Sequence, residues 1–273
     1  RRVVTEQWFE TAFGSHYPLL YRHRDQAEAE RCLKQLANMA SLGGGASSLI
    51  LDLGCGDGRH LELLAGRGLR AVGLDLSADL LRYAQGRTGW PSPPVLARGD
   101  MRNLPFLPAS FGTVLSLFTA FGYFGSPDQN GAPVREIARV LQPGGHWFLD
   151  YFDGDAVRRE LAGGQEKHRN RTLGPVEVVE SRRLAADRSV VAKRVHLVPV
   201  TGRESEAAEF GVGAAGVRYT EEVADFTRKQ LVSLAEGQGL EPVAAAGGYE
   251  GQEIGQGSRW ILVFRKAPNT ANI

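Results

Sequence analysis

The chain has 273 residues, 42% hydrophobic and 23% charged, which is ordinary for a globular protein with a substantial core. Its 32 lysines and arginines nearly balance its 31 aspartates and glutamates, leaving a net charge of +1. This balance excludes a general electrostatic attraction to nucleic acid or to an anionic membrane, although a local basic patch is compatible with it.

Cysteine use and hydropathy limit the cellular setting. The two cysteines, Cys32 and Cys55, have no spacing typical of a metal site or a disulfide framework, so we expect reduced thiols, no bound metal and a cytoplasmic location. No apolar run follows residues 1–4, which argues against a secretory signal. The uncharged stretch 104–127 is interrupted by prolines and glycines, so it predicts turn, strand and loop rather than a membrane helix.

The N-terminal part predicts a helical cap over residues 1–40. Apolar residues at Ala29, Cys32, Leu33 and Leu36 have the spacing of an amphipathic helix over 25–40, and glycines follow at 43–45. Proline 18 prevents a single helix across the aromatic residues before it.

From residue 48 to 153 short apolar runs alternate with helical segments. We expect strands at 48–53, 69–74, 95–98, 113–118 and 146–151, and helices at 59–65, 78–85 and 134–141. Pro133 suits the first turn of the last of these helices. Apolar strands that alternate with helices predict a doubly wound α/β fold with a largely parallel sheet.

Residues 154–217 interrupt this alternation. Two β-rich runs at 176–183 and 190–198 flank a turn at 185–188 and predict an antiparallel hairpin, and 202–216 is expected to be loop. Thr220, followed by two glutamates, predicts a helix to about residue 236, and two final strands are expected at 240–246 and 258–266. We therefore expect one domain over 1–273, with its core at 41–153 and 218–266 and an excursion at 154–217.

The segment after the first expected strand predicts the ligand. Glycines at 54, 56 and 58 allow a backbone to approach a ligand closely. The dinucleotide fingerprint G-x-G-x-x-G would require glycine at 59, where this chain has Arg59. A carboxylate at Asp52 would repel a pyrophosphate, whereas it suits S-adenosylmethionine, which carries an ammonium and a sulfonium but no phosphate. The loop therefore favours the methyl donor over NAD.

Acidic residues end the next two strands. Asp75 can accept hydrogen bonds from both hydroxyls of a ribose, a requirement shared by several nucleoside ligands. Asp100 beside Met101 offers an acceptor and an apolar surface to an adenine, although a turn residue alone would also explain Asp100. Both positions lie at the carboxyl edge of the sheet, on the same side as Gly54.

These motifs resemble those of class I S-adenosylmethionine-dependent methyltransferases: D-x-G-x-G-x-G from residue 52, an acid ending the second strand, G-D-M-R-x-L-P-F from 99 and L-x-P-G-G from 141. The resemblance covers roughly 45–153 and, more loosely, the two final strands. It implies a Rossmann-like, seven-stranded sheet with its last strand antiparallel. It also implies a donor site at the ends of the first four strands. The methionine part would be lined by Asp52, Gly54, Cys55 and Gly56, and the ribose would contact Asp75 and Leu76. The adenine would contact Asp100 and Met101, and the sulfonium would lie near Leu117 or Phe118.

The sequence indicates the methyl acceptor less specifically than it indicates the methyl donor. An activated methyl group requires alignment more than acid–base catalysis, so the sequence needs no catalytic triad and we find none. Tyr123 and Tyr151 follow the fourth and fifth strands, and Tyr21 lies in the N-terminal cap, so these three are the acceptor-side candidates. Arg24 is a candidate partner for the donor's carboxylate.

The sequence therefore predicts an enzyme that methylates a nitrogen or oxygen atom of a small molecule, with S-adenosylmethionine as cofactor. The alternatives are a methyltransferase acting on RNA or protein, a non-catalytic S-adenosylmethionine-binding regulator and, disfavoured by Arg59 and Asp52, a nicotinamide oxidoreductase. The basic cluster 167–171 could bind an acidic acceptor or RNA, but the near-zero net charge disfavours nucleic acid. The excursion at 154–217 could complete an acceptor pocket or form a homodimer contact.

Overall fold

The computed structural model describes residues 8–22, 25–43, 48–125, 127–187 and 189–268, and the structural statements below concern these residues. The chain divides into two compact units. The core unit consists of Arg24–Val157 and Phe226–Ile273, and the small-sheet unit of Arg1–His23 and Arg158–Asp225. Each unit is described by itself.

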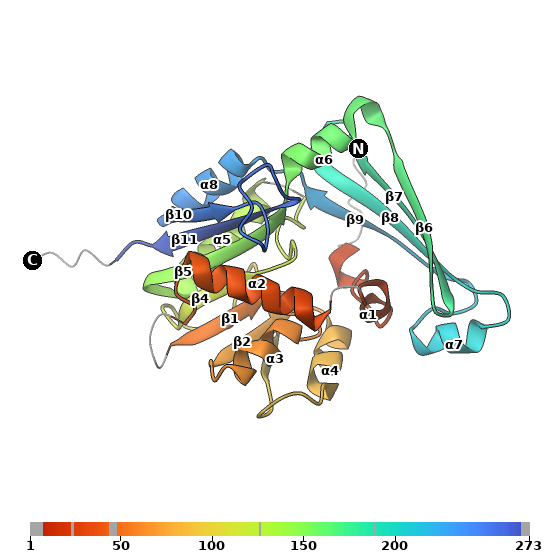
Figure 1. The fold of residues 1–273 in the computed structure, drawn as a ribbon, viewed down its shortest axis with the longest axis horizontal. Coiled ribbons are helices and arrows are strands. Elements are labelled where there is room, and N and C mark those ends of the chain that lie inside the picture. Colours follow the sequence, from red (N-terminus) through yellow and green to blue (C-terminus); the bar gives the residue numbers. More distant parts are fainter. Residues whose placement is uncertain (1–7, 23–24, 44–47, 126, 188, 269–273) are drawn as a thin grey trace, which may run out of the picture. The chain divides into compact units, whose positions relative to one another are not determined.

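The core unit contains a seven-stranded sheet of strand order β10-β11-β5-β4-β1-β2-β3 (Figure 1). Strands β1 to β5 pair in parallel, whereas β11 is antiparallel to both of its neighbours. This confirms the expected doubly wound, Rossmann-like α/β sheet with an antiparallel last strand. The strands are β1 (Leu49–Leu53), β2 (Ala71–Asp75), β3 (Val95–Arg98), β4 (Phe111–Ser116), β5 (Leu141–Phe152), β10 (Leu240–Ala246) and β11 (Arg259–Lys266).

Helices cover this sheet because each presents an apolar stripe to it. In α2, Cys32, Leu33 and Leu36 are fully buried against strand residues such as Ile50 and Phe148. The sequence placed Pro133 at a helix start, but α5 begins six residues earlier and Pro133 lies inside it. The helices are α2 (Gln26–Met39), α3 (Arg59–Gly66), α4 (Ala78–Gly86), α5 (Pro127–Val140) and α8 (Arg228–Glu236). The chain passes from the core unit to the small-sheet unit within α6 (Gly154–Glu160).

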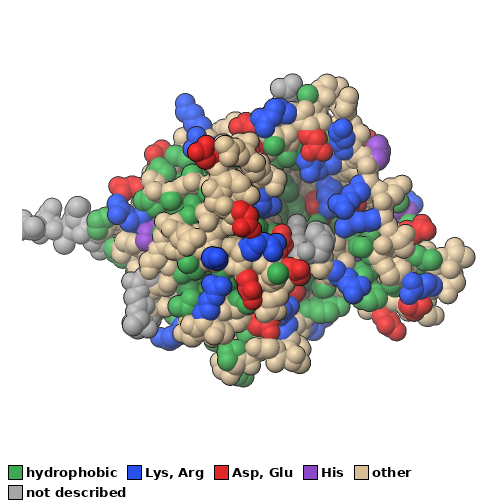
Figure 2. All heavy atoms as spheres, in the orientation of Figure 1, with side chains coloured by type: hydrophobic (Ala, Val, Ile, Leu, Met, Phe, Trp, Pro, Cys, Tyr) green, Lys and Arg blue, Asp and Glu red, His purple; other side chains and the backbone are tan. Residues whose placement is uncertain are grey.

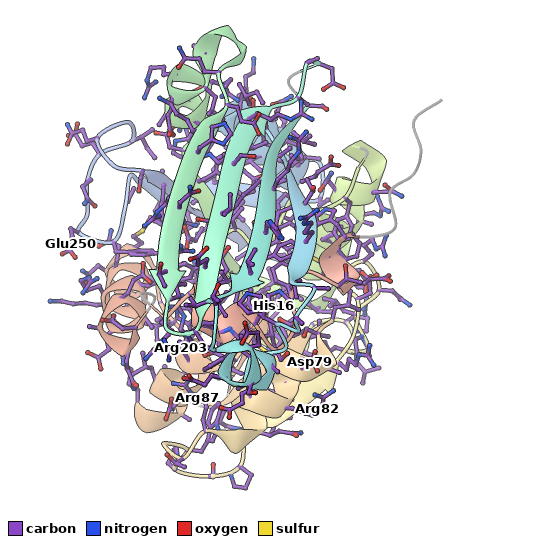
Figure 3. All side chains as sticks on the ribbon, turned by 90° about the vertical axis from the view of Figure 1, so that its right-hand side faces the viewer. His16, Asp79, Arg82, Arg87, Arg203 and Glu250 are labelled. Carbon is purple, nitrogen blue, oxygen red and sulfur yellow. The ribbon has the colours of Figure 1, made fainter. Side chains whose placement is uncertain are left out.

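The small-sheet unit is built on a four-stranded antiparallel sheet of order β6-β7-β8-β9, which Figure 3 shows nearly face on. Leu19 and Leu20 of α1 pack against Val178 and Leu197 of this sheet. The N-terminal segment thereby supplies the apolar cover for one sheet face. The elements are η1 (Trp8–Glu10), α1 (Tyr17–Leu20), η2 (Ala162–Gly164), β6 (Lys167–Leu173), β7 (Val176–Leu184), β8 (Val190–Pro199), α7 (Glu204–Glu209) and β9 (Val217–Ala224).

The structure corrects two expectations in this region, and it confirms the hairpin as β7 and β8 while adding a strand on either side. The helix expected from Thr220 is wrong, because this residue lies in β9, which pairs with β8 along its length, and the capping box that starts α8 is formed by Thr227 and Gln230. The expected hairpin is part of a four-stranded sheet, because the basic cluster 167–171 forms the edge strand β6. The expected loop at 202–216 contains α7.

The unit boundaries also differ from the expected segments. Residues 218–224 lie in β9 of the small sheet, although they were expected in the core, and the expected cap 1–40 is divided between the units. The reason is pairing: β9 finds its hydrogen-bond partner in β8, while α2 buries its stripe on the seven-stranded sheet.

Candidate functional site

The glycine loop leaves the carboxyl end of β1. Gly54, Gly56 and Gly58 have φ values of +79°, +55° and +78°, in the left-handed region that glycine tolerates and other residues avoid. The N–H groups of Gly54 and Cys55 donate to the carbonyl of Leu74 on β2, at 2.8 and 3.1 Å. A Cβ placed on Gly54 would lie 2.7 Å from the Cβ of Ala120, so no larger residue fits there.

Asp75, at the end of β2, fixes the middle of this loop. One carboxylate oxygen accepts the N–H of Gly56 at 2.8 Å, and the other accepts the N–H of Ser77 at 2.8 Å. Burial raises the pKa of Asp75, while these backbone hydrogen bonds act in the opposite direction. A carboxylate oxygen has more than one acceptor position, so both oxygens can accept a further hydrogen bond from a ligand.

Asp52 is the charged group at the base of the loop. It is buried at the end of β1, and its Oδ2 has no hydrogen-bond partner among the described residues. Burial, followed by the neighbouring Asp75, raises the pKa of Asp52 to about 7, although Arg59 opposes the shift. A buried oxygen without a partner is costly to the fold and indicates a place for a ligand that donates a hydrogen bond.

The chain leaves β3 at the same edge of the sheet as β2, and the two segments that follow these strands lie side by side. We call the segment after each strand its exit. The Gly99 N–H donates to the carbonyl of Asp75 at 3.1 Å, and Arg98 Nε donates to the carbonyl of Leu76 at 3.0 Å. The next acid, Asp100, forms an ion pair with Arg102, whose Nη2 lies 2.5 Å from its Oδ2.

The pairing of Asp100 with Arg102 was not expected from the sequence. Partial burial would raise the pKa of Asp100, but the hydrogen bonds and charge of Arg102 outweigh it and lower this pKa. Asp100 is therefore a carboxylate that already has one protein partner, whereas Met101 beside it is half-buried. The G-D-M-R motif itself could have indicated the pair, since it places an arginine two residues after the acid.

The exit of β4 completes the edge of the sheet. Leu117 is buried, and Phe118 and Thr119 have φ values of +52° and +61°, which are unusual for residues with a side chain. Phe118 and Thr119 form a corner of the chain, and Ala120, the next residue, lies against Gly54 of the glycine loop. Thus the structure brings together the exits of β1, β2, β3 and β4, as the sequence predicted for one carboxyl edge.

The acceptor-side candidates differ in burial and in the unit to which they belong. Tyr151 is fully buried in β5, with its ring 4.6 Å from that of Phe152 and its hydroxyl against Gly122, which indicates a packing role rather than contact with an acceptor. Tyr123 is half-buried in the loop after β4. Tyr21 belongs to the small-sheet unit, and Arg24 lies outside the described residues.

Tyr21 takes part in a charged cluster of the small-sheet unit. Its hydroxyl accepts a hydrogen bond from Lys193 Nζ at 3.0 Å and donates to Glu221 at 3.4 Å. Burial alone would lower the pKa of Lys193, but its acidic neighbours Glu221 and Glu180 raise it. The sequence did not predict this cluster, because its members come from β7, β8, β9 and the residue after α1.

Comparison with known proteins assigns the family. A family model described as a methyltransferase domain matches residues 50–145. A dTDP-3-amino-3,4,6-trideoxy-alpha-D-glucopyranose N,N-dimethyltransferase of Streptomyces venezuelae is 32% identical over 163 residues, which are 56% of this chain and 67% of that protein. The chain belongs to the class I S-adenosylmethionine-dependent methyltransferase family.

This methyltransferase has other relatives. It is 29% identical over 215 residues to the cypemycin N-terminal methyltransferase of a Streptomyces species, covering 78% of this chain and 81% of that protein. A methyltransferase structure from Clostridium acetobutylicum shares its fold, with a TM-score of 0.72 at 16% identity over 92% of this chain and 96% of that one. In several other curated proteins the matching part spans only 41–54% of their length.

The surface, the helices and the residue clusters of this methyltransferase add three findings. Acidic and basic side chains are interspersed on the face shown in Figure 2, in keeping with the net charge of +1. Within the described ranges no helix is long and apolar enough to cross a bilayer. Nor do three or more His, Cys, Asp or Glu side chains of the described residues gather in a way that could hold a metal ion.

Proposed function

We propose that this enzyme transfers a methyl group from S-adenosylmethionine to an amino nitrogen of a small molecule by in-line displacement. The buried, unpartnered Oδ2 of Asp52 at the glycine loop is the observation that carries the donor half of the proposal. The names of two relatives support the acceptor half: one is an amino-sugar N,N-dimethyltransferase, and the other is an N-terminal methyltransferase, whose name points to a chain terminus that carries an amino group.

The residues at the carboxyl edge fit the donor's chemistry. Asp52 offers a negative charge to the donor's ammonium, and the backbone at Gly54, Cys55 and Gly56 leaves room for its methionine part. Asp75 offers two acceptor oxygens to the ribose hydroxyls, beside Leu76. The adenine is assigned to Asp100 and Met101, the sulfonium to Leu117, and the carboxylate to Arg24.

When bound, S-adenosylmethionine supplies a methyl group that is already activated on a sulfonium. The chain then has to orient the acceptor in line with that methyl group and exclude water, which can provide most of the rate enhancement. Tyr123 and Tyr21 are the proposed acceptor-side residues, whereas the packing of Tyr151 disfavours it for this role.

Asp75→Ala is expected to weaken donor binding at least tenfold, because it removes the ribose acceptor and leaves two partly buried N–H groups without their partner. Titration calorimetry with S-adenosylmethionine and S-adenosylhomocysteine measures the effect. Asp79→Ala is the matched control: this acid lies four residues later, on α4, in an exposed pair with Arg82 (2.6 Å; Figure 3), and should change affinity little. An Asp75→Ala protein that is folded and binds as tightly as the wild type contradicts the ribose assignment.

The acceptor class is tested by transfer of an isotope-labelled methyl group. We expect label on a nucleotide-linked amino sugar, and none on the same sugar with a hydroxyl in place of the amine. A peptide with a free N-terminus, paired with its N-acetylated form, tests the second candidate, which the 81% coverage of the cypemycin enzyme favours. Label only on the hydroxyl sugar or on RNA would overturn nitrogen as the acceptor atom, and tight donor binding without any transfer would favour a regulator.

The cellular setting and the assembly are part of the same proposal. Both cysteines are free and buried, which supports a reducing compartment such as the cytoplasm. A homodimer is proposed as well, with the small-sheet unit as its contact. Gel filtration with light scattering, compared with a variant charged on the small sheet, tests the dimer.

A further inference from the structure

A buried acid at the end of β5 holds the chain that leaves β4. Asp150 is completely buried, and its carboxylate accepts hydrogen bonds from the Phe118 N–H at 2.8 Å and the Tyr249 hydroxyl at 2.5 Å. It also forms an ion pair with the guanidinium of Arg259 on β11. The carbonyl of Asp150 accepts the N–H of Thr119 at 2.9 Å, and Arg259 Nη2 donates to the Thr119 hydroxyl at 3.0 Å. Three hydrogen bonds therefore tie the corner Phe118–Thr119 to β5 and β11.

The corner needs this support because its backbone is strained. Phe118 and Thr119 both have positive φ, at +52° and +61°, and a β-branched residue such as threonine is rarely found there. Such a conformation persists only where the surrounding structure imposes it, and strained residues gather at functional sites. A glycine at either position would be free of this strain.

The corner also contacts the elements assigned to the donor. Ala120, the next residue, lies against Gly54. The Arg59 guanidinium, at the start of α3, lies 4.0 Å from the centre of the Phe118 ring, and His60 lies 5.5 Å from it. A shift of the corner would therefore displace Ala120 and the Phe118 ring, which contact the glycine loop and the start of α3.

We propose that Asp150, Arg259 and Tyr249 are positioning residues that hold Phe118–Thr119 in its strained form, so that the donor side of the site is preformed. The inference rests on the proposed function, because it assigns the glycine loop to the methyl donor. Preformed geometry lowers the ordering cost of binding, so loss of the network should weaken the binding of the methyl donor. Burial would lower the pKa of Arg259, but Asp150 and Tyr249 raise it, so the arginine keeps its charge inside the protein.

The first test is Thr119→Gly, which removes the backbone strain at residue 119 and the hydrogen bond from Arg259. We expect a higher thermal midpoint together with about tenfold weaker binding of S-adenosylmethionine, since the released corner no longer has one conformation. Ala109→Gly is the matched control: Ala109 also has positive φ, at +53°, but it is exposed in the segment before β4. This control should gain stability and keep its donor affinity.

The second test is Arg259→Lys, which keeps the charge but removes the forked contact to Asp150 and Thr119. We expect a higher Kd and KM for S-adenosylmethionine with the KM of the acceptor unchanged. Arg265→Lys is the control, because Arg265 lies on the same strand in an exposed pair with Glu241. If Arg259→Lys does not fold, Thr119→Gly decides alone.

The outcomes separate the two proposals. Wild-type protein that does not bind S-adenosylmethionine overturns the proposed function, before any variant is compared. If the wild type binds S-adenosylmethionine and Thr119→Gly binds it as tightly, the positioning role is overturned. An Arg259→Lys protein that loses affinity only for the acceptor overturns it too, because Arg259 would then contact the acceptor directly.

Discussion

Asp52→Asn is expected to stabilise the protein while weakening its binding of the methyl donor. The pKa of Asp52 is raised from 3.8 to about 7, chiefly by burial. Above pH 7 the folded state thus holds a carboxylate that would be better solvated in the unfolded chain, at a cost of up to about 4 kcal/mol. Asparagine avoids the charge but buries an amide that also needs partners, so we expect a net gain of about 2 kcal/mol at pH 8.

The raised pKa of Asp52 also predicts how the stability of the wild type changes with pH. Between about pH 4 and pH 7 the folded state retains the Asp52 proton that the unfolded state has lost, so the free energy of unfolding falls as pH rises through that window. Asp52→Asn removes this decline. Urea denaturation at pH 5 and pH 8 should therefore show a larger gain at pH 8. An equal or negative difference at both pH values would show that Asp52 is not the titrating group.

Donor affinity should change in the opposite direction. An ammonium requires the ionised form of Asp52, so the affinity of the wild type should rise as pH increases towards 7 and level off above it. Loss of a buried charge partner costs about 2–5 kcal/mol, so Asp52→Asn should bind at least about 30-fold more weakly, with a flatter pH profile. Titration calorimetry between pH 6 and pH 8 measures both effects. Unchanged affinity in the variant would contradict the assignment of Asp52 to the ammonium.

The second large effect is expected from Gly54→Ala. An alanine would have to adopt φ of +79° and place its Cβ 2.7 Å from that of Ala120. Backbone strain and overpacking together should cost about 3 kcal/mol and move the glycine loop. We expect a lower thermal midpoint and no measurable donor binding.

Two variants separate the causes of this loss. Gly54→Ala combined with Ala120→Gly removes the collision but keeps the strained φ, so it should recover part of the stability. Gly66→Ala is the control, because it lies at the end of α3 with no atom within 4 Å of its added Cβ and should be neutral or slightly stabilising. Thermal unfolding and donor titration of all three, alongside the wild type, check the prediction. A Gly54→Ala protein as stable and as tightly binding as the wild type would contradict it.

Much of the core unit follows from local patterns. The strands ending at Leu53 and Asp75 and the helices beginning at Arg59 and Ala78 lie within about two residues of the predicted bounds. Apolar runs, caps and glycine turns act over a few residues, so they are readable without a partner segment. The antiparallel last strand was expected from family resemblance and not from periodicity.

The small-sheet unit shows where local patterns fail. The segment around Thr220 has helix-start residues, yet it forms β9 because β8 provides its pairing partner. Likewise, nothing in the basic cluster 167–171 predicts a strand, yet this largely exposed segment forms β6 by pairing with β7. Sheet propensity depends on the neighbouring strand, which the sequence of one segment does not contain.

The glycine loop shows which features the sequence determines and which require the tertiary structure. The sequence by itself determined which residues reach the carboxyl edge and, through Asp52 and Arg59, which cofactor chemistry suits them. Only the tertiary structure decided that Asp52 is buried without a partner for Oδ2, and that Asp150, Tyr249 and Arg259 hold the corner after β4. Long-range hydrogen bonds join residues that are far apart in the chain, from 32 positions for Phe118 and Asp150 to 140 positions for Thr119 and Arg259, so no local spacing could reveal them.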